Sequence, residues 1–147
     1  QKQKVMETYY PLMYMLAAFF GSVLLVIGYY RLNNEMADME SRLTGVWVND
    51  AQTMRIIIHN VDSVFQGEIV WADSRHQGNQ LLGATLIRDL VMKKLFQGST
   101  GVYLDPFKGR EMPFQMWWKG RKNIKFSLID KVNGRNKVIR EEVWHQI

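Results

Sequence analysis

Cysteine is absent from this chain of 147 residues, and only three prolines and three histidines are present. Without cysteine the protein can form neither a disulfide nor a thiolate metal site. His59, His76 and His145 lack the i, i+4 spacing that puts two imidazoles on one helical face, so the sequence predicts no metal site and no cofactor. Motifs for a nucleophile, a phosphate-binding loop or a pair of acid–base carboxylates are also missing. These absences predict a protein that is not an enzyme.

The net charge of +5 is modest and unevenly distributed. Residues 1–43 hold equal numbers of basic and acidic residues, so the excess lies in residues 44–147. An excess of this kind usually serves solubility. No nucleic-acid-binding motif accompanies it, so we expect no nucleic-acid partner.

Residues 9–30 form an uncharged apolar run with a tyrosine pair at each end. A helix needs roughly 20 apolar residues to cross a bilayer, and tyrosine is favoured at the headgroup level on either side. A signal peptide would have a shorter apolar region and a small-x-small cleavage site, whereas Tyr29-Tyr30-Arg31-Leu32 follows here. A core helix of a soluble domain would carry a polar face. The run therefore predicts a retained single-pass transmembrane helix, preceded by an N-terminal tail over residues 1–8.

The basic residues that flank this helix do not decide its orientation. Lys2 and Lys4 precede it, and Arg31 and Arg42 follow it. Orientation follows the difference in Lys and Arg between the two flanks, and here the flanks are equal.

A helical pattern continues beyond the membrane-spanning run, over residues 31–43. Leu32, Met36, Met39 and Leu43 recur at helical spacing and form one apolar stripe. The segment therefore predicts an amphipathic helical stalk. The stripe can pack on the protein's own soluble domain or on another subunit, and the spacing does not choose between these interpretations.

Inside the membrane-spanning run, small residues recur four positions apart. Ala17 is followed by Gly21, and Ala18 by Ser22. Small residues at this spacing let two helix backbones approach closely in lipid, which predicts association with other transmembrane subunits. The alternative is an ordinary anchor whose small residues face membrane lipids.

From Thr44 onward the apolar period changes from helical to alternating. Alternating runs bounded by turns rich in Asn, Asp and Gly predict strands at 54–60, 64–71, 112–118, 123–129 and 137–144. Residues 81–95 are the exception and predict a short helix. Four apolar residues there fit helical spacing, namely Leu82, Leu86, Leu90 and Val91. Short strands at regular intervals predict a small antiparallel β-barrel or β-sandwich over residues 44–147, with one short helix. The preferred fold is a single transmembrane helix plus an all-β domain in the form of a small antiparallel barrel.

Period two also assigns large side chains to one face of the predicted sheet. The residues expected in the barrel interior are Trp47, Phe65, Trp71, Phe114, Met116 and Phe126. An eight-stranded barrel is just wide enough for such side chains or for one small ligand. Because so many of these side chains are aromatic, we expect a core filled by its own residues. A barrel that keeps room for an apolar small molecule is the alternative.

A set of local motifs occurs in a recognisable order along residues 44–147. Gly45-Val46-Trp47 opens the first strand, and residues 101–110 have the form G-x-Y-x-D-P-x-x-G-R. This order resembles a bacterial family of small lipocalin-like domains of unknown function, whose best signal is G-x-Y-x-D-P-x-x-G-K/R. The resemblance implies a lipocalin-like barrel. Because members are often exported, it also implies an extracytoplasmic, periplasmic location.

The resemblance further implies a role for Trp47. In the lipocalin signature, a tryptophan at this position plugs one barrel end beneath an arginine from the last strand. Arg140 is the candidate for that arginine, through a cation–π contact.

Two polar segments of the barrel are expected at turns. Asp105-Pro106 is interpreted as a turn rather than a chemical site. The Asp side chain can hydrogen-bond to its own backbone, Pro sets the next φ angle, and Gly109 gives the backbone conformational freedom where the turn ends. The second segment is a basic hairpin with Lys119, Arg121, Lys122 and Lys125. It is either a solvated turn that protects a sheet edge or a contact for anionic lipid headgroups or an acidic partner.

These features favour a non-enzymatic, membrane-anchored accessory subunit of a larger membrane protein complex. Its extracytoplasmic barrel would act as a protein-interaction module, and its partners would be membrane lipids and other transmembrane subunits. The alternative is a lipocalin-like carrier or sensor of an apolar small molecule.

Overall fold

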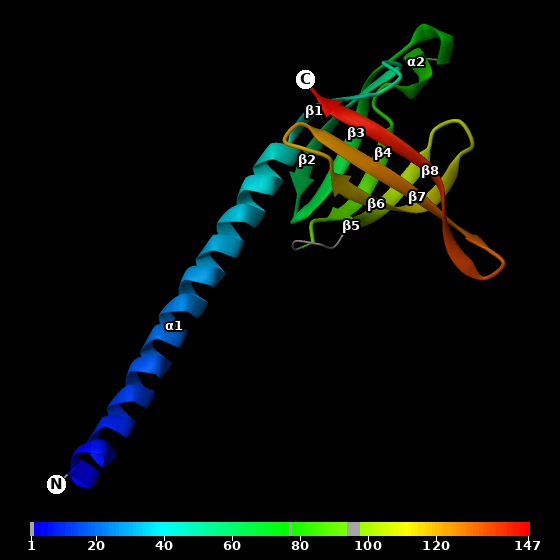
Figure 1. Cartoon of the computed structure of the whole chain (residues 1–147). Coiled ribbons are helices and arrows are strands. Elements are labelled where there is room, and N and C mark those ends of the chain that lie inside the picture. Colours follow the sequence, from blue (N-terminus) through cyan, green and yellow to red (C-terminus); the bar gives the residue numbers. More distant parts are fainter. Residues whose placement is uncertain (1, 77, 94–97) are drawn as a thin grey trace. The chain divides into compact units, whose positions relative to one another are not determined.

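The computed structural model describes residues 2–76, 78–93 and 98–147 (Figure 1). The chain divides into two compact units, one that ends at Asp38 and one that comprises Met39–Ile147. The first unit is helical. The second holds the last turn of the same helix and the β-domain.

Helix α1 runs without interruption over Lys2–Leu43. Residues 2–8, expected as a tail, are therefore helical, and the helix ends where the predicted stalk ends. Among the described residues, α1 is the helix long and apolar enough to cross a membrane, over Tyr9–Leu43. Within the described residues, none of its most apolar window is buried.

Eight antiparallel strands form a closed barrel in which each strand pairs with its neighbours in sequence and β8 closes on β1 (Figure 1). The strands are β1 Gly45–Asn49, β2 Met54–Val61, β3 Val64–Ala72, β4 Thr85–Val91, β5 Ser99–Asp105, β6 Arg110–Trp118, β7 Asn123–Val132 and β8 Arg135–Gln146. Between β3 and β4 lie a 3₁₀ turn, Ser74–His76, and a short helix, α2 Gly78–Leu81. The fold expected from sequence, a transmembrane-length helix plus a small antiparallel barrel with one short helix, is confirmed.

The five strands predicted from alternation are all present, as β2, β3, β6, β7 and β8. The helix predicted over residues 81–95 is wrong, because β4 occupies Thr85–Val91; residues 94 and 95 lie outside the described residues. β4 carries a bulge, since Phe65 pairs with Leu90 and Gly67 with Ile87, three positions on β4 against two on β3. Ile87 and Leu90 are therefore both buried although they are three residues apart, which imitates helical spacing.

The barrel interior is filled by aromatic and aliphatic side chains. Five of the six residues predicted there expose 1% or less of their surface: Trp47, Phe65, Phe114, Met116 and Phe126. The ring centroids of Phe114 and Phe126 are 5.2 Å apart, and those of Phe126 and Trp144 are 5.8 Å apart. These separations are typical of packed aromatic pairs.

Trp71 is the sixth residue predicted in the interior, and this prediction is wrong because 40% of its surface is exposed. β3 carries a bulge of its own, since Ile56 pairs with Ile69 and Arg55 with Trp71, so that Val70 is an extra residue. An extra residue shifts the alternation by one position and turns Trp71 outward. There the Arg55 guanidinium carbon lies 5.2 Å from the centre of the indole ring.

The end of the predicted apolar stripe packs on the protein's own barrel. Leu43 is fully buried and Met39 is half-buried within the unit that contains the barrel. Leu32, in the other unit, is 40% exposed. The first of the two interpretations of the stripe therefore holds for its last turn.

Candidate functional site

The two ends of the barrel differ in composition. At one, which we call the helix end, the last turn of α1 meets the β6–β7 turn (residues 119–122) and the end of β8. At the other, the pocket end, lie the β1–β2 turn (50–53), the β5–β6 turn (106–109) and the β7–β8 hairpin. The strand order fixes this arrangement, because consecutive antiparallel strands turn at alternate ends.

At the helix end, barrel side chains satisfy carbonyl groups that α1 leaves unpaired at its C-terminus. The Trp47 indole donates to the Leu43 carbonyl oxygen at 2.8 Å, and the Gln146 amide donates to the Arg42 carbonyl oxygen at 2.9 Å. The last carbonyl groups of a helix have no partner within the helix, so these bonds complete it. They also join α1 to the first and last strands of the barrel.

The arginine that lies on a tryptophan at this end comes from α1 and not from β8. The Arg42 guanidinium carbon lies 4.8 Å from the centre of the Trp118 ring, and Trp118 meets Trp47 edge to face at 6.2 Å. The prediction that Arg140 covers Trp47 is wrong, because Arg140 lies over Tyr103. Arg140 is near the middle of β8, and its inward position faces the pocket end.

The predicted basic hairpin forms the β6–β7 turn and the start of β7. Lys119, Arg121 and Lys122 are exposed, and within the described residues none of the three forms an ion pair. Lys125 differs, because its ammonium lies 3.4 Å from the Glu141 carboxylate across the β7–β8 pair. The hairpin thus presents three solvent-exposed positive charges at the helix end.

Gly101, Asp105, Gly109 and Arg110 of the G-x-Y-x-D-P-x-x-G-R motif have structural roles. A Cβ atom at Gly101 would lie 2.8 Å from the ring of Phe114 and 3.0 Å from the Cα atom of Leu90, so only glycine fits there. Asp105 accepts hydrogen bonds from the backbone N–H groups of Phe107 at 2.9 Å and Lys108 at 3.1 Å. These bonds confirm the predicted turn.

The end of the motif anchors the β7–β8 hairpin. Gly109 donates its N–H to the Asp105 carbonyl oxygen at 2.9 Å and takes a positive φ of 60°, which glycine adopts readily. Arg110 then pairs with Asp130 on β7 at 2.6 Å. The hydrogen bond from Arg110 lowers the pKa of Asp130.

Inside the pocket end, four side chains form one hydrogen-bonded cluster. The Glu142 carboxylate accepts from Arg140 at 3.0 Å, from the Tyr103 hydroxyl at 3.1 Å and from the Trp144 indole at 3.3 Å. Arg140 also donates to the Tyr103 oxygen at 3.3 Å and lies 3.9 Å from the buried Asp105 carboxylate. One guanidinium therefore faces two carboxylates and an aromatic ring.

Burial, followed by the negative charge of Glu142, raises the pKa of Tyr103 well above its usual range. The positive charge of Arg140 acts in the opposite direction and does not outweigh these effects. The hydroxyl therefore stays protonated and donates to Glu142.

A cavity of about 190 Å³ opens beside this cluster. Its lining includes Asn49, Met54, Phe107, Arg140, Glu142 and Trp144. Pockets for drug-sized ligands occupy about 300–1,000 Å³, so this cavity is large enough for one side chain or a small polar molecule.

The three histidines lie on different elements of the chain. His145 bridges the Asn123 side chain at 2.6 Å and the Asp50 carboxylate at 2.9 Å, which links β8 to β7 and to the β1–β2 turn. His59 lies on β2, and His76 ends the 3₁₀ turn. Within residues 2–76, 78–93 and 98–147, no three metal-ligating side chains come together.

The small residues predicted for helix association lie in the apolar part of α1. A Cβ atom at Gly21 would meet nothing within 4 Å outside the helix. Ser22 donates its hydroxyl to the Ala18 carbonyl oxygen at 2.7 Å, so its polar atom is already satisfied. Ala17, Ala18, Gly21 and Ser22 therefore form a strip of small side chains on α1, and its role in helix association stays a prediction.

We found no match to this chain among models of protein families, among curated proteins or among solved structures. The resemblance to lipocalin-like domains therefore stays a prediction.

Proposed function

We propose that this protein is a non-enzymatic accessory subunit of a larger membrane protein complex. α1 would anchor it through residues 9–30 and associate with other transmembrane subunits. The barrel would lie on the extracytoplasmic side, in the periplasm, and act as a protein-interaction module. This placement rests on the resemblance to exported lipocalin-like domains.

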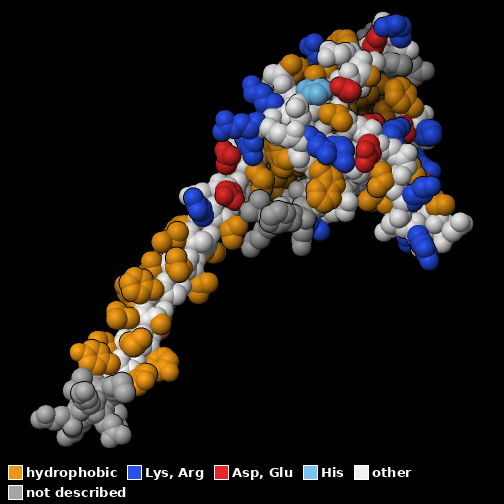
Figure 2. All heavy atoms as spheres, viewed as in Figure 1, with side chains coloured by type: hydrophobic (Ala, Val, Ile, Leu, Met, Phe, Trp, Pro, Cys, Tyr) orange, Lys and Arg blue, Asp and Glu red, His pale blue; other side chains and the backbone are white. Residues whose placement is uncertain are grey.

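The observation that carries this proposal is the exposed apolar surface of α1. Its side chains from Tyr9 to Tyr30 are almost all exposed, and apolar groups cover the face of α1 seen in Figure 2. An apolar surface of this length is stable only in lipid or against other helices. The hydrogen bonds from Trp47 and Gln146 then hold the last turn of the same helix on the barrel.

The filled barrel supports an interaction module over a carrier. An apolar ligand would need an enclosed space among Phe65, Met116 and Phe126, and these three side chains are buried in the packed core. The cavity at the pocket end has a volume of only about 190 Å³, and Arg140 and Glu142 are the two charged residues in its lining. A carrier or sensor of a small molecule is therefore the second candidate, and this cavity supports it.

Membrane lipids are the other proposed partner. Lys119, Arg121 and Lys122 are exposed at the helix end, where the chain leaves α1. Basic residues near an anionic membrane surface contribute about 1 kcal/mol each to binding. This surface would hold the helix end of the barrel close to headgroups.

The proposal is tested by purification in a mild detergent with Gly21→Leu. A leucine at this position would block close approach of a second helix, so we expect loss of co-purifying transmembrane subunits while the barrel stays folded. Gly21→Ala keeps a small residue and should retain them. Val23→Leu adds a methylene group on the opposite side of α1 and should also retain them.

Two results would contradict the proposal. Recovery of the native protein as a monomer without partners would contradict the subunit function. Equal retention of partners by Gly21→Leu and Val23→Leu would contradict the role of the small residues of α1 in association. Near-ultraviolet circular dichroism of each variant reports whether the barrel is intact.

A further inference from the structure

Within the described residues, most of the β8 edge that faces β1 has no paired strand. β1 ends at Asn49, which pairs with Trp144, and the last backbone bond on this side runs from the Asp50 N–H to the Val143 carbonyl oxygen at 2.9 Å. In the part of the chain that the structure describes, β8 therefore pairs with β7 alone from Glu142 back to Arg135. Backbone groups alternate in direction along a strand, so the N–H and C=O of Glu141 point to the same side as those of Val143.

This free edge belongs to a hairpin that extends beyond the barrel wall. The β6–β7 pairing begins at Phe114 and Leu128, so Ile129–Val132 and Arg135–Val138 pair only with each other. Val138 and Ile139 are each 46% exposed. Unpaired strand edges with exposed apolar residues are templates for addition of another strand.

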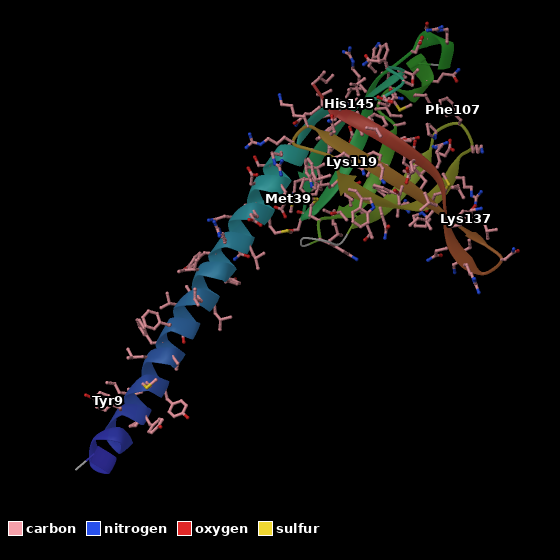
Figure 3. All side chains as sticks on the ribbon, in the orientation of Figure 1. Tyr9, Met39, Phe107, Lys119, Lys137 and His145 are labelled. Atoms are coloured by element: carbon pink, nitrogen blue, oxygen red, sulfur yellow. The ribbon has the colours of Figure 1, made fainter. Side chains whose placement is uncertain are left out.

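The surroundings of the edge are basic. Lys108, Lys131, Arg135 and Lys137 are exposed, and the part of the chain that the structure describes gives them no ion-pair partner. Figure 2 shows blue side chains along this hairpin, and Figure 3 places Phe107 and Lys137 at the end of the barrel away from Lys119. An occupant of the edge should therefore be acidic.

The cavity lies beside the same edge. Arg140, Glu142 and Trp144 on β8 form one wall, and Met54 and Phe107 lie among its other residues. Its volume of about 190 Å³ suits one large apolar side chain of a bound segment. Affinity in strand addition comes from backbone hydrogen bonds, and specificity comes from pockets for alternate side chains.

We propose that the free edge of β8 binds an extended acidic segment of a partner protein by strand addition, with one apolar side chain in the cavity. The proposal rests on the interaction-module function above and names the surface that performs it. The backbone of Glu141 would pair with the segment, and Arg135 and Lys137 would face its carboxylates.

The test uses the full-length protein in detergent and a synthetic peptide in which glutamates alternate with valine and leucine. We expect the Glu141 amide to become protected from hydrogen exchange when the peptide is added. The peptide with methylated backbone nitrogens cannot form a ladder and should give no protection. Arg135→Glu with Lys137→Glu should weaken binding roughly tenfold at low salt, because the charges then repel.

A matched variant separates this surface from general attraction to positive charge. Lys119→Glu with Arg121→Glu makes the same charge change in exposed residues at the helix end and should bind the peptide as the native protein does. The proposal would be overturned if both double variants lost peptide affinity equally, or if the Glu141 amide gained no protection from hydrogen exchange. So would binding of anionic phospholipid vesicles, but not the peptide, through Arg135 and Lys137.

This experiment is independent of α1 association. If the native protein binds the peptide but the Gly21→Leu variant keeps its partners, only the proposed role of α1 in association is refuted. If Gly21→Leu loses its co-purifying partners but the native protein does not bind the peptide, only the proposed role of the β8 edge is refuted.

Discussion

The indole N–H of Trp47 donates a 2.8 Å hydrogen bond to the carbonyl oxygen of Leu43, and both residues are fully buried. Leu43 is the last residue of α1, and Trp47 lies in β1, the first strand. The bond therefore joins the end of the helix to the core of the barrel. The last turn of α1, from Met39, belongs to the same compact unit as the strands.

Replacement of Trp47 by phenylalanine should destabilise the barrel by about 1–3 kcal/mol, because it leaves the buried Leu43 carbonyl group without a partner. Denaturant unfolding of the full-length protein in detergent, followed by near-ultraviolet circular dichroism, measures the change. Trp71→Phe is the matched control, since Trp71 is 40% exposed, and should change stability by less than about 0.5 kcal/mol. Equal effects of the two substitutions would refute the role of the Trp47 bond.

Gly101→Ala should destabilise the barrel by about 1–3 kcal/mol, as overpacked cores do. The added methyl group would lie 2.8 Å from the Phe114 ring. Phe114→Leu shortens that side chain, so the double variant should lose less than the sum of the two single losses. Unfolding free energies of the four proteins form a double-mutant cycle, and additive values would show that Gly101 and Phe114 do not contact each other.

The strands were predictable because most of the barrel alternates strictly. Phe114 and Met116 on β6 face inward at period two, as do Phe126 and Leu128 on β7. The wrong predictions lie at bulges, where one extra residue moves the side chains that follow it to the other face of the sheet. The amino-acid composition of the strand does not reveal this change. Val70 turns Trp71 outward, and the β4 bulge lets Ile87 and Leu90 point inward together.

The cluster at the pocket end was only partly visible in the sequence. Arg140, Glu142 and Trp144 alternate on β8, so the inward Trp144 signals that the two charged residues also point inward. Their partner Tyr103 is 39 residues from Glu142 in sequence, and no local pattern links strands so far apart. Arg42 was likewise assigned to a membrane flank because its contact with Trp118 exists only after the barrel has formed.

The unusual pKa of Tyr103 predicts a loss of stability at alkaline pH. Its folded-state pKa is raised above the ordinary value of 10.0, so the folded protein keeps a proton that the unfolded chain releases. The contribution of Tyr103 to the free energy of unfolding is complete below pH 10.0 and is lost as the pH rises above this value. Tyr103→Phe should therefore show a weaker fall in unfolding free energy between about pH 9 and pH 11.

Tyr103 is the one tyrosine in residues 44–147, so the barrel offers no second phenol to confuse the measurement. Lysines titrate in the same range, but they are common to both proteins and cancel in the difference. Parallel curves for the native protein and Tyr103→Phe would show that Tyr103 ionises as freely in the folded protein as in the unfolded one.

Phe114→Ala decides whether the barrel core is filled or holds a ligand. Phe114 is 1% exposed and packs edge to face against Phe126 and Tyr103, with ring centroids 5.2 Å and 6.4 Å away. Truncation of a packed phenylalanine to alanine costs about 3–5 kcal/mol. The cost arises because the transfer free energy of the removed atoms is lost and because a cavity is left behind. Thermal and denaturant unfolding of the full-length protein should show a loss in this range.

Phe107→Ala provides the comparison for this truncation. Phe107 is 61% exposed at the rim of the small cavity, so its loss should change stability by less than about 0.5 kcal/mol. A phenylalanine that lined an open ligand site would already lack packing partners on one side. If Phe114→Ala lost as little stability as Phe107→Ala, the interior would contain such a site, and the carrier function would replace the accessory subunit as the better proposal.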